Sequence, residues 1–227
     1  MKTLRTTTCA GHGHPEFRIT FDPSVVVVPD DARWLLTGLE ASVAEGTRYK
    51  PGETVQVGWA LTEVRQGEDG DLSLWESDMR SLPVQWSMGL SRTLAQLRVQ
   101  KDVVESVLGA DDVSFPSMRQ SALICSRLGQ GEEFILDRSK PADADSGWFF
   151  GCRHNDHDHN SAEELRRVSV YEAALLATRI IPYLALPPGV MVGLRGPATS
   201  IFLNGEPLDL KPGSYLAARA CASADCR

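Results

Sequence analysis

The chain has 227 residues and a formal net charge of −7, with 42% hydrophobic and 23% charged residues. This composition is ordinary for a globular protein, and no apolar run approaches the roughly 18 residues of a membrane span, which excludes an integral membrane protein. The negative charge disfavours binding to nucleic acid or to an anionic membrane and favours a basic partner.

The start of the chain predicts strands and then a helix. Residues 17–21 alternate between apolar and polar side chains, which is typical of a half-buried strand, and the valines at 25–28 predict a more buried continuation. Residues 32–43 carry apolar side chains at helical spacing, with Asp30 or Asp31 as the expected cap. These patterns predict a strand region that is followed by an amphipathic helix.

The rest of the first half predicts a hairpin, a second helix and a domain boundary. Apolar residues alternate along 55–61 and again along 72–75, with a polar turn between the two runs. A helical stripe follows over 90–108, and its spacing leaves room for a break near Gln100. The polar, proline-containing segment 110–117 then predicts a boundary. We therefore expect two domains, an acidic amino-terminal domain at 1–112 and a second domain at 117–227.

Charge is unevenly divided along the sequence. Residues 1–114 hold 11 basic and 17 acidic side chains, a net charge of −6, whereas residues 115–227 have a net charge of −1. A basic partner would therefore be attracted mainly to the first half, since complementary fields speed association.

The second half mixes short strands with helices. Apolar runs at 122–125, 134–136, 148–150, 190–194 and 200–203 predict strands, and Asn204-Gly205 is a strong hairpin signal. A capping pattern at Ser161 or Asn160 predicts a helix to about residue 177. Because the order lacks a repeating strand–helix–strand rhythm, the predicted fold class is α+β, with two small domains built on largely antiparallel sheets.

Several short elements of the second half recur together in a known family. The apolar strand 122–125, the turn and strand Asp145-Ser146-Gly147-Trp148, a polar loop, Tyr171 and the element Pro182-Tyr183-Leu184 follow one another in order. Over roughly residues 117–210 the chain thereby resembles the bacterial immunity-protein family numbered thirty-three. The resemblance implies a protein that binds and neutralises a cognate secreted toxin, as antidotes to type VI secretion effectors do, without turnover and without a cofactor.

A histidine-rich loop is the sharpest chemical feature of the sequence. The run from Cys152 to His159 holds His154, His157 and His159 with Asp156 and Asp158, which are side chains that can bind zinc. Its spacing matches neither a zinc-peptidase helix nor a zinc finger, so we expect a solvated loop and no metal site. A metal-dependent hydrolase that uses His154, His157, His159 and Asp156 is the alternative.

The cysteines add no catalytic signature to this pattern. Five of them at irregular spacings indicate neither a disulfide framework nor a Cys-x-x-Cys site, and they fit a reducing cytoplasm. Cys125, inside an apolar run, is expected to pack as a small hydrophobic side chain, and Cys221 and Cys226 are expected in a frayed end. The start of the chain lacks the apolar core of a signal peptide, so a cytoplasmic protein is expected.

The sequence thus predicts a cytoplasmic immunity protein that is not an enzyme. Its expected partner is a basic protein toxin, for example a nuclease with a positive substrate surface. A scaffold or adaptor without a toxin is a further alternative. The candidate partner-binding residues are Asp145, Trp148, His154, Asp156, His157, Asp158, Glu68 and Asp69.

Overall fold

The computed structural model describes residues 1–26, 28–154 and 156–224. The chain divides into two compact units, Met1–Arg98 and Val99–Arg227, and each contains its own sheet and helices. The fold class is α+β, as the sequence predicts. In the described residues, no helix is long and apolar enough to cross a membrane.

The division between the units lies inside a helix, not in the polar segment at 110–117. Helix α2 spans Ser91–Glu105, and the first unit ends at Arg98. Within the first unit, the Trp59 indole Nε1 donates to Gln96 Oε1 at 3.1 Å. Within the second unit, Gln100 Nε2 donates to the Ile181 carbonyl at 2.8 Å. The apolar stripe is interrupted near Gln100, where the sequence leaves room for a break, although the predicted domain boundary lies later, at 110–117.

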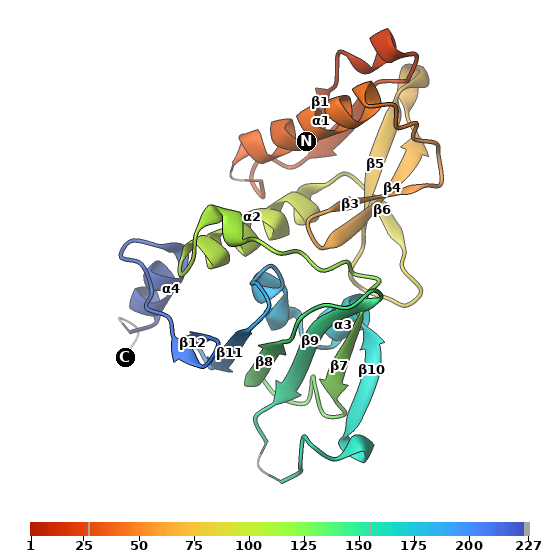
Figure 1. The fold of residues 1–227 in the computed structure, drawn as a ribbon. Helices are drawn as coiled ribbons and strands as arrows, with labels where there is room; N and C mark the ends of the chain where they lie inside the picture. The colour runs from red at the N-terminus through yellow and green to blue at the C-terminus, as the bar shows by residue number, and fades with distance from the viewer. Residues whose placement is uncertain (27, 155, 225–227) are drawn as a thin grey trace. The chain divides into compact units, whose positions relative to one another are not determined.

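The first unit has a six-stranded sheet with helix α1 packed against it, and it also contains the first part of α2 (Figure 1). The order is β1-β2-β5-β4-β3, β6 pairs with β5, and only β2 and β5 run parallel. Its strands are β1 Lys2–Arg5, β2 Phe17–Phe21, β3 Thr54–Val57, β4 Ala60–Gln66, β5 Leu72–Ser77 and β6 Trp86–Met88. Short 3-10 turns cover Cys9–His12 (η1) and Glu68–Gly70 (η2).

Helix α1 follows the sheet's second strand and corrects the predicted continuation at 25–28. It spans Pro29–Ala44, with Val28 as the N-cap residue and Pro29 in its first turn, so neither Asp30 nor Asp31 caps it. Val25 and Val28 are exposed, and residues 23–25 form a turn, not a strand. Val27 lies outside the described residues. The proline favours helix initiation here because its missing N–H would have no intrahelical partner.

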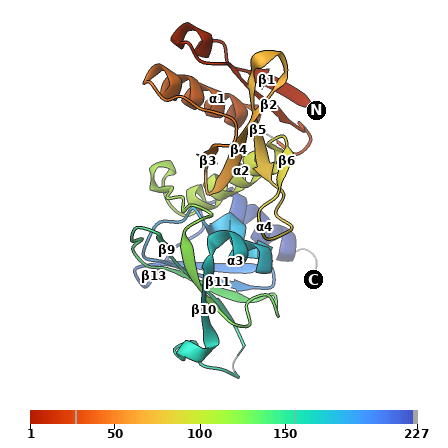
Figure 2. The same ribbon diagram turned by 90° about the vertical axis from the view of Figure 1, so that its right-hand side faces the viewer.

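The second unit is a seven-stranded sheet in the order β10-β7-β9-β8-β11-β12-β13. All neighbours are antiparallel except β7 and β9. The strands are β7 Ser121–Cys125, β8 Phe134–Arg138, β9 Asp145–Cys152, β10 Leu165–Ser169, β11 Val190–Arg195, β12 Ala198–Leu203 and β13 Glu206–Pro207. Helix α3 spans Val170–Leu176 and packs on β7 and β10. Figure 2 shows it beside β10.

The helix predicted over 161–177 is mostly absent. A 3-10 turn (η4) covers Ala162–Glu164, β10 then occupies Leu165–Ser169, and only Val170–Leu176 is helical. Ser161 makes no side-chain capping bond, whereas Ser169 Oγ accepts from the Glu172 amide at 3.0 Å. Pairing with β7 therefore overrides the local helical pattern. The remaining short helices are η3 Ala110–Asp112, η5 Thr178–Tyr183 and α4 Tyr215–Ala224.

The two structural units share the negative charge more evenly than the two halves of the sequence do. The first unit holds 10 basic and 13 acidic residues, a net charge of −3, and the second unit holds 13 and 17, a net charge of −4. The difference of three charges arises because Lys101, Asp102, Glu105, Asp111 and Asp112 belong to the second unit. The acidic character is therefore shared and is not confined to an amino-terminal domain.

Candidate functional site

The histidine loop, residues 153–160, connects β9 to the η4 turn at one end of the second sheet (Figure 1). Apart from Asn155, which lies outside the described residues, its side chains separate into two groups. His154, Asp156 and Asp158 are exposed. By contrast, the His157 side chain is only 2% exposed, and His159 is half-buried. The loop thus presents carboxylates to solvent and turns two imidazoles inward.

The inward imidazoles meet two buried thiols. We call Cys125, Cys152, His157 and His159 the cysteine–histidine cluster; one ligand atom from each lies within 4.8 Å of the others. His157 Nε2 lies 3.0 Å from Cys125 Sγ and 3.4 Å from Cys152 Sγ. His159 Nε2 lies 3.6 Å from Cys152 Sγ, and the two sulfurs are 3.7 Å apart. Four side chains with lone pairs suited to a metal therefore converge on one point.

Sheet topology explains how residues 27 apart in sequence bring their thiols together. Cys125 is the last residue of β7, and Cys152 is the last residue of β9. These strands are parallel neighbours, with Ile124 opposite Phe150, so their carboxyl ends lie at the same edge of the sheet. The loop that follows β9 then returns its histidines over this edge.

Charged neighbours surround the cluster on the solvent side. Asp156 Oδ1 lies 3.2 Å from His157 Nδ1, and its Oδ2 accepts from Arg127 Nη1 at 2.6 Å. The hydrogen bonds from His157 and Arg127 lower the pKa of Asp156 to about 2. Contact with the Cys125 thiol and with Asp156 raises the pKa of His157. Burial lowers the pKa of His159, and the neighbouring His157 lowers it further.

The thiols differ in their surroundings. Burial alone would raise the pKa of Cys125, but hydrogen bonds from the Arg127 amide and from His157 outweigh it, and the pKa is lowered. For Cys152 burial is the largest influence and the pKa is raised. Both side chains are inaccessible, with exposures of 0% for Cys125 and 1% for Cys152.

The structure places two of the predicted partner-binding residues in structural roles. Trp148 is 1% exposed, its Nε1 donates to the Leu184 carbonyl at 3.3 Å, and its ring stacks on Phe150. Its side chain therefore packs in the core of the second unit and is not displayed on the surface. His157 is also a poor contact residue, because its ring points into the cluster.

Asp145 is partly engaged within the fold. Its Oδ1 accepts from the Gly147 amide at 2.8 Å, and its Oδ2 pairs with the Arg167 guanidinium. Although burial opposes the charged form, these bonds lower the pKa of Asp145. The carboxylate thereby fixes the turn at the start of β9.

Glu68 and Asp69 lie in the first unit, apart from the other candidates. Their side chains are 86% and 85% exposed, and both lie near the Arg18 guanidinium, at 3.5 and 3.6 Å. Glu68 and Arg18 also line a depression of about 470 Å³ beside Trp75. Both carboxylates are exposed, and they belong to a different unit from the histidine loop.

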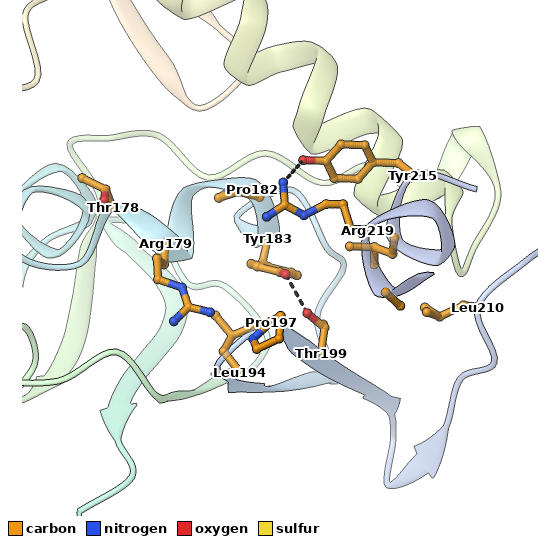
Figure 3. A pocket seen from close by; sticks show the side chains of 12 residues that line it. Thr178, Arg179, Pro182, Tyr183, Leu194, Pro197, Thr199, Leu210, Tyr215 and Arg219 are labelled. Atoms are coloured by element: carbon orange, nitrogen blue, oxygen red, sulfur yellow. Dashed lines mark hydrogen bonds between the residues drawn. The ribbon is translucent and has the colours of Figure 1, made fainter. Parts of the chain in front are cut away.

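A pocket of about 240 Å³ opens in the second unit between η5, β12 and α4 (Figure 3). The Tyr183 hydroxyl lies 3.0 Å from Thr199 Oγ1, and Arg219 Nη1 donates to the Tyr215 hydroxyl at 3.2 Å. Arg179 points its guanidinium at the carbonyls of Glu132 and Gly196. The lining residues include neither a carboxylate nor a thiol, so they provide no general base or nucleophile of those kinds.

Cys125 is the functional candidate that the sequence pattern missed, because it was expected to pack as a hydrophobic side chain. Cys152 begins the histidine-rich run at 152–159, but the sequence did not identify it as a possible ligand. The sequence pattern that could have identified the cluster is Cys152-x4-His157-x-His159, together with Cys125 at the end of another apolar strand. His154 and Asp156, which the hydrolase alternative requires as ligands, are exposed and lie outside the cluster.

The fold and this site describe a two-unit α+β protein whose second unit joins a mixed sheet to an acidic loop. Residues 99–202 match the family model described as the Imm33-like domain. Over this segment, which begins at the first residue of the second unit, the chain is similar to the Imm33-like domain. The comparisons with curated proteins and with solved structures each gave no match.

Proposed function

We propose that this protein is an immunity protein that binds a cognate secreted bacterial toxin and neutralises it, acting by association and without turnover. The Imm33-like domain over residues 99–202 is the observation that carries the proposal. A type VI secretion effector is the proposed source of the toxin, and the cytoplasm of the producing cell is the proposed site of action. Toxin neutralisation requires tight binding, and a nanomolar dissociation constant corresponds to about −12 kcal/mol.

The surface charge supports a basic toxin, such as a nuclease. Both units have a net negative charge, and the histidine loop exposes the carboxylates of Asp156 and Asp158. Glu105, Asp111 and Asp112 add exposed carboxylates at the end of α2 and in η3. Nucleases carry positive substrate-binding surfaces, and a complementary negative surface speeds encounter and suppresses wrong pairing.

The proposal is tested by expressing the product of the adjacent toxin-like reading frame with and without this chain. Neutralisation predicts growth only when the two are expressed together. Equal killing in both cultures would contradict the proposal. Co-purification of the two proteins then shows whether protection arises by direct binding.

Charge reversal identifies the unit that carries the interface. Asp158→Lys alters the histidine loop, and Glu68→Lys is a matched change in the first unit, because both side chains are exposed. If the loop faces the toxin, only the Asp158 change slows association, and the effect weakens as salt is added, since exposed charges are screened over about 8–10 Å. Slowing by Glu68→Lys alone would place the interface on the first unit.

A further inference from the structure

We propose that Cys125, Cys152, His157 and His159 form a structural zinc site in the Imm33-like domain. The site joins the ends of β7 and β9 to the histidine loop. This inference goes beyond toxin binding, and its test requires no toxin.

The distances in the cysteine–histidine cluster match a tetrahedral shell. Zinc bonds of about 2.3 Å to sulfur and 2.0–2.1 Å to nitrogen give tetrahedral edges of about 3.8 Å between sulfurs and about 3.6 Å between sulfur and nitrogen. The two sulfurs lie 3.7 Å apart. Cys152 Sγ lies 3.4 Å from His157 Nε2 and 3.6 Å from His159 Nε2. The Cys125 Sγ to His157 Nε2 distance of 3.0 Å is shorter than such an edge and would lengthen when zinc binds.

The donor set selects zinc and a structural role. Two thiolates and two imidazoles in a tetrahedral arrangement suit zinc, and four protein ligands leave no open position for a water or a substrate. This closed shell differs from the hydrolase alternative, which needs an open coordination site. An iron–sulfur cluster with two cysteine and two histidine ligands would hold its thiolates and imidazoles on different irons. The short distances from His157 to both sulfurs instead favour a single ion.

The surroundings of His157 have the form expected around a zinc ligand. Its Nε2 faces the sulfurs while its Nδ1 lies 3.2 Å from the Asp156 carboxylate. Arg127 in turn holds that carboxylate at 2.6 Å. A carboxylate on the outer nitrogen fixes the orientation and tautomer of a ligating imidazole. Asp156 is thus a positioning residue, not a ligand.

Two other uses of these side chains fit less well. Cys125, His157 and Asp156 are arranged in the order of a nucleophile, a base and an orienting acid. However, Cys125 is 0% exposed and the His157 side chain is 2% exposed, so a substrate cannot reach the sulfur. A disulfide between Cys125 and Cys152 would leave both imidazoles without the thiolates that they face.

The site has a consequence for the surface of the domain. His157 and His159 alternate with Asp156 and Asp158 along the loop, so anchoring the two imidazoles turns the two carboxylates outward. Zinc would therefore hold the acidic face of the loop in one conformation.

The test measures metal in the full-length chain, expressed without a polyhistidine tag and purified under reductant without chelator. We expect stoichiometric zinc, and after exchange with Co²⁺ we expect intense visible bands of tetrahedral cobalt together with sulfur-to-cobalt charge transfer. Cys152→Ser and His159→Gln should abolish both signals. Asp156→Asn should retain the metal but weaken its affinity about 10–100-fold, as loss of an outer partner does.

Matched variants separate the site from adventitious binding and from misfolding. His154→Ala removes an exposed imidazole of the same loop, and Cys9→Ser removes a buried thiol of the first unit, so both should retain stoichiometric zinc. Circular dichroism verifies that each variant is folded. Folded wild-type protein that stays free of zinc after incubation with Zn²⁺ would overturn the proposal. Equal zinc in wild type and Cys152→Ser would also overturn it, as would a Cys125–Cys152 disulfide that persists under reductant.

Discussion

Gly147, in the Asp-Ser-Gly-Trp turn that begins β9, cannot accept a side chain. Its φ angle is +75°, and a Cβ built there would collide with the Ser139 carbonyl oxygen, with the carbonyl carbons of Ser139 and Lys140 at 3.0 and 3.3 Å. The backbone cannot withdraw easily, because the Ser139 amide donates to the Gly147 carbonyl at 2.9 Å. Gly147→Ala therefore combines a left-handed backbone with a clash against main chain.

The magnitude follows from these two contributions. A left-handed conformation costs an L-residue about 1–2 kcal/mol, and overpacking costs about 1–3 kcal/mol more. We therefore expect Gly147→Ala to lower the free energy of unfolding by about 2–5 kcal/mol. Gly213→Ala is the matched control, with a φ of +72° and nothing within 4 Å of the added Cβ. It should show only the conformational cost of about 1–2 kcal/mol. Effects of alanine on the unfolded chain are common to both variants and cancel.

Urea unfolding, monitored by circular dichroism and tryptophan fluorescence, gives the free energy of unfolding of each variant by linear extrapolation. Both glycines belong to the second unit, so the same transition reports both variants. A loss at Gly147 that equals the loss at Gly213 would refute the close backbone approach that this structure shows.

Two further predictions concern stability. Asp71, whose side chain is 4% exposed, accepts from Arg5 Nε at 2.7 Å and from Arg18 Nη2 at 3.1 Å, and the Arg5 hydrogen bond is the largest cause of its lowered pKa. The charged carboxylate contributes fully to the free energy of unfolding above its unfolded pKa of about 3.9, and this contribution is lost as pH falls through the lower folded pKa. Asp71→Asn should therefore lower the free energy of unfolding by about 2 kcal/mol at neutral pH and flatten the acid limb of a stability–pH curve. An undiminished acid limb would contradict this. Ser169→Ala should cost about 1 kcal/mol in a denaturation series because it removes the cap of α3, whereas Ser161→Ala should cost little, and equal losses would refute the capping assignment.

The sequence predicted the fold class and most strands because their signals are local. The alternation at 17–21 and the apolar run at 122–125 each correspond to a strand in the structure. The strand predicted at 25–28 is absent because high strand propensity does not supply a pairing partner, and α1 begins directly after these residues. The helix predicted at 161–169 is absent because a pairing partner is present: residues 165–169 pair with β7 as a strand.

The candidate site was only half visible in the sequence. Its histidines stand together in one loop, but Cys125 reaches them only through the parallel pairing of β7 with β9. No spacing rule encodes that contact, because its register depends on the whole sheet. The sequence also did not reveal burial, because Trp148 belongs to the motif that resembles the family and is enclosed in the core.

Titration of the purified chain with the product of the adjacent toxin-like reading frame tests toxin binding most directly. Isothermal titration calorimetry should show a saturable complex with a dissociation constant on the order of nanomolar, which corresponds to about −12 kcal/mol. The same complex should appear as a single peak in size-exclusion chromatography. The absence of both heat and co-elution at micromolar concentrations, with both proteins folded, would contradict the proposed immunity function.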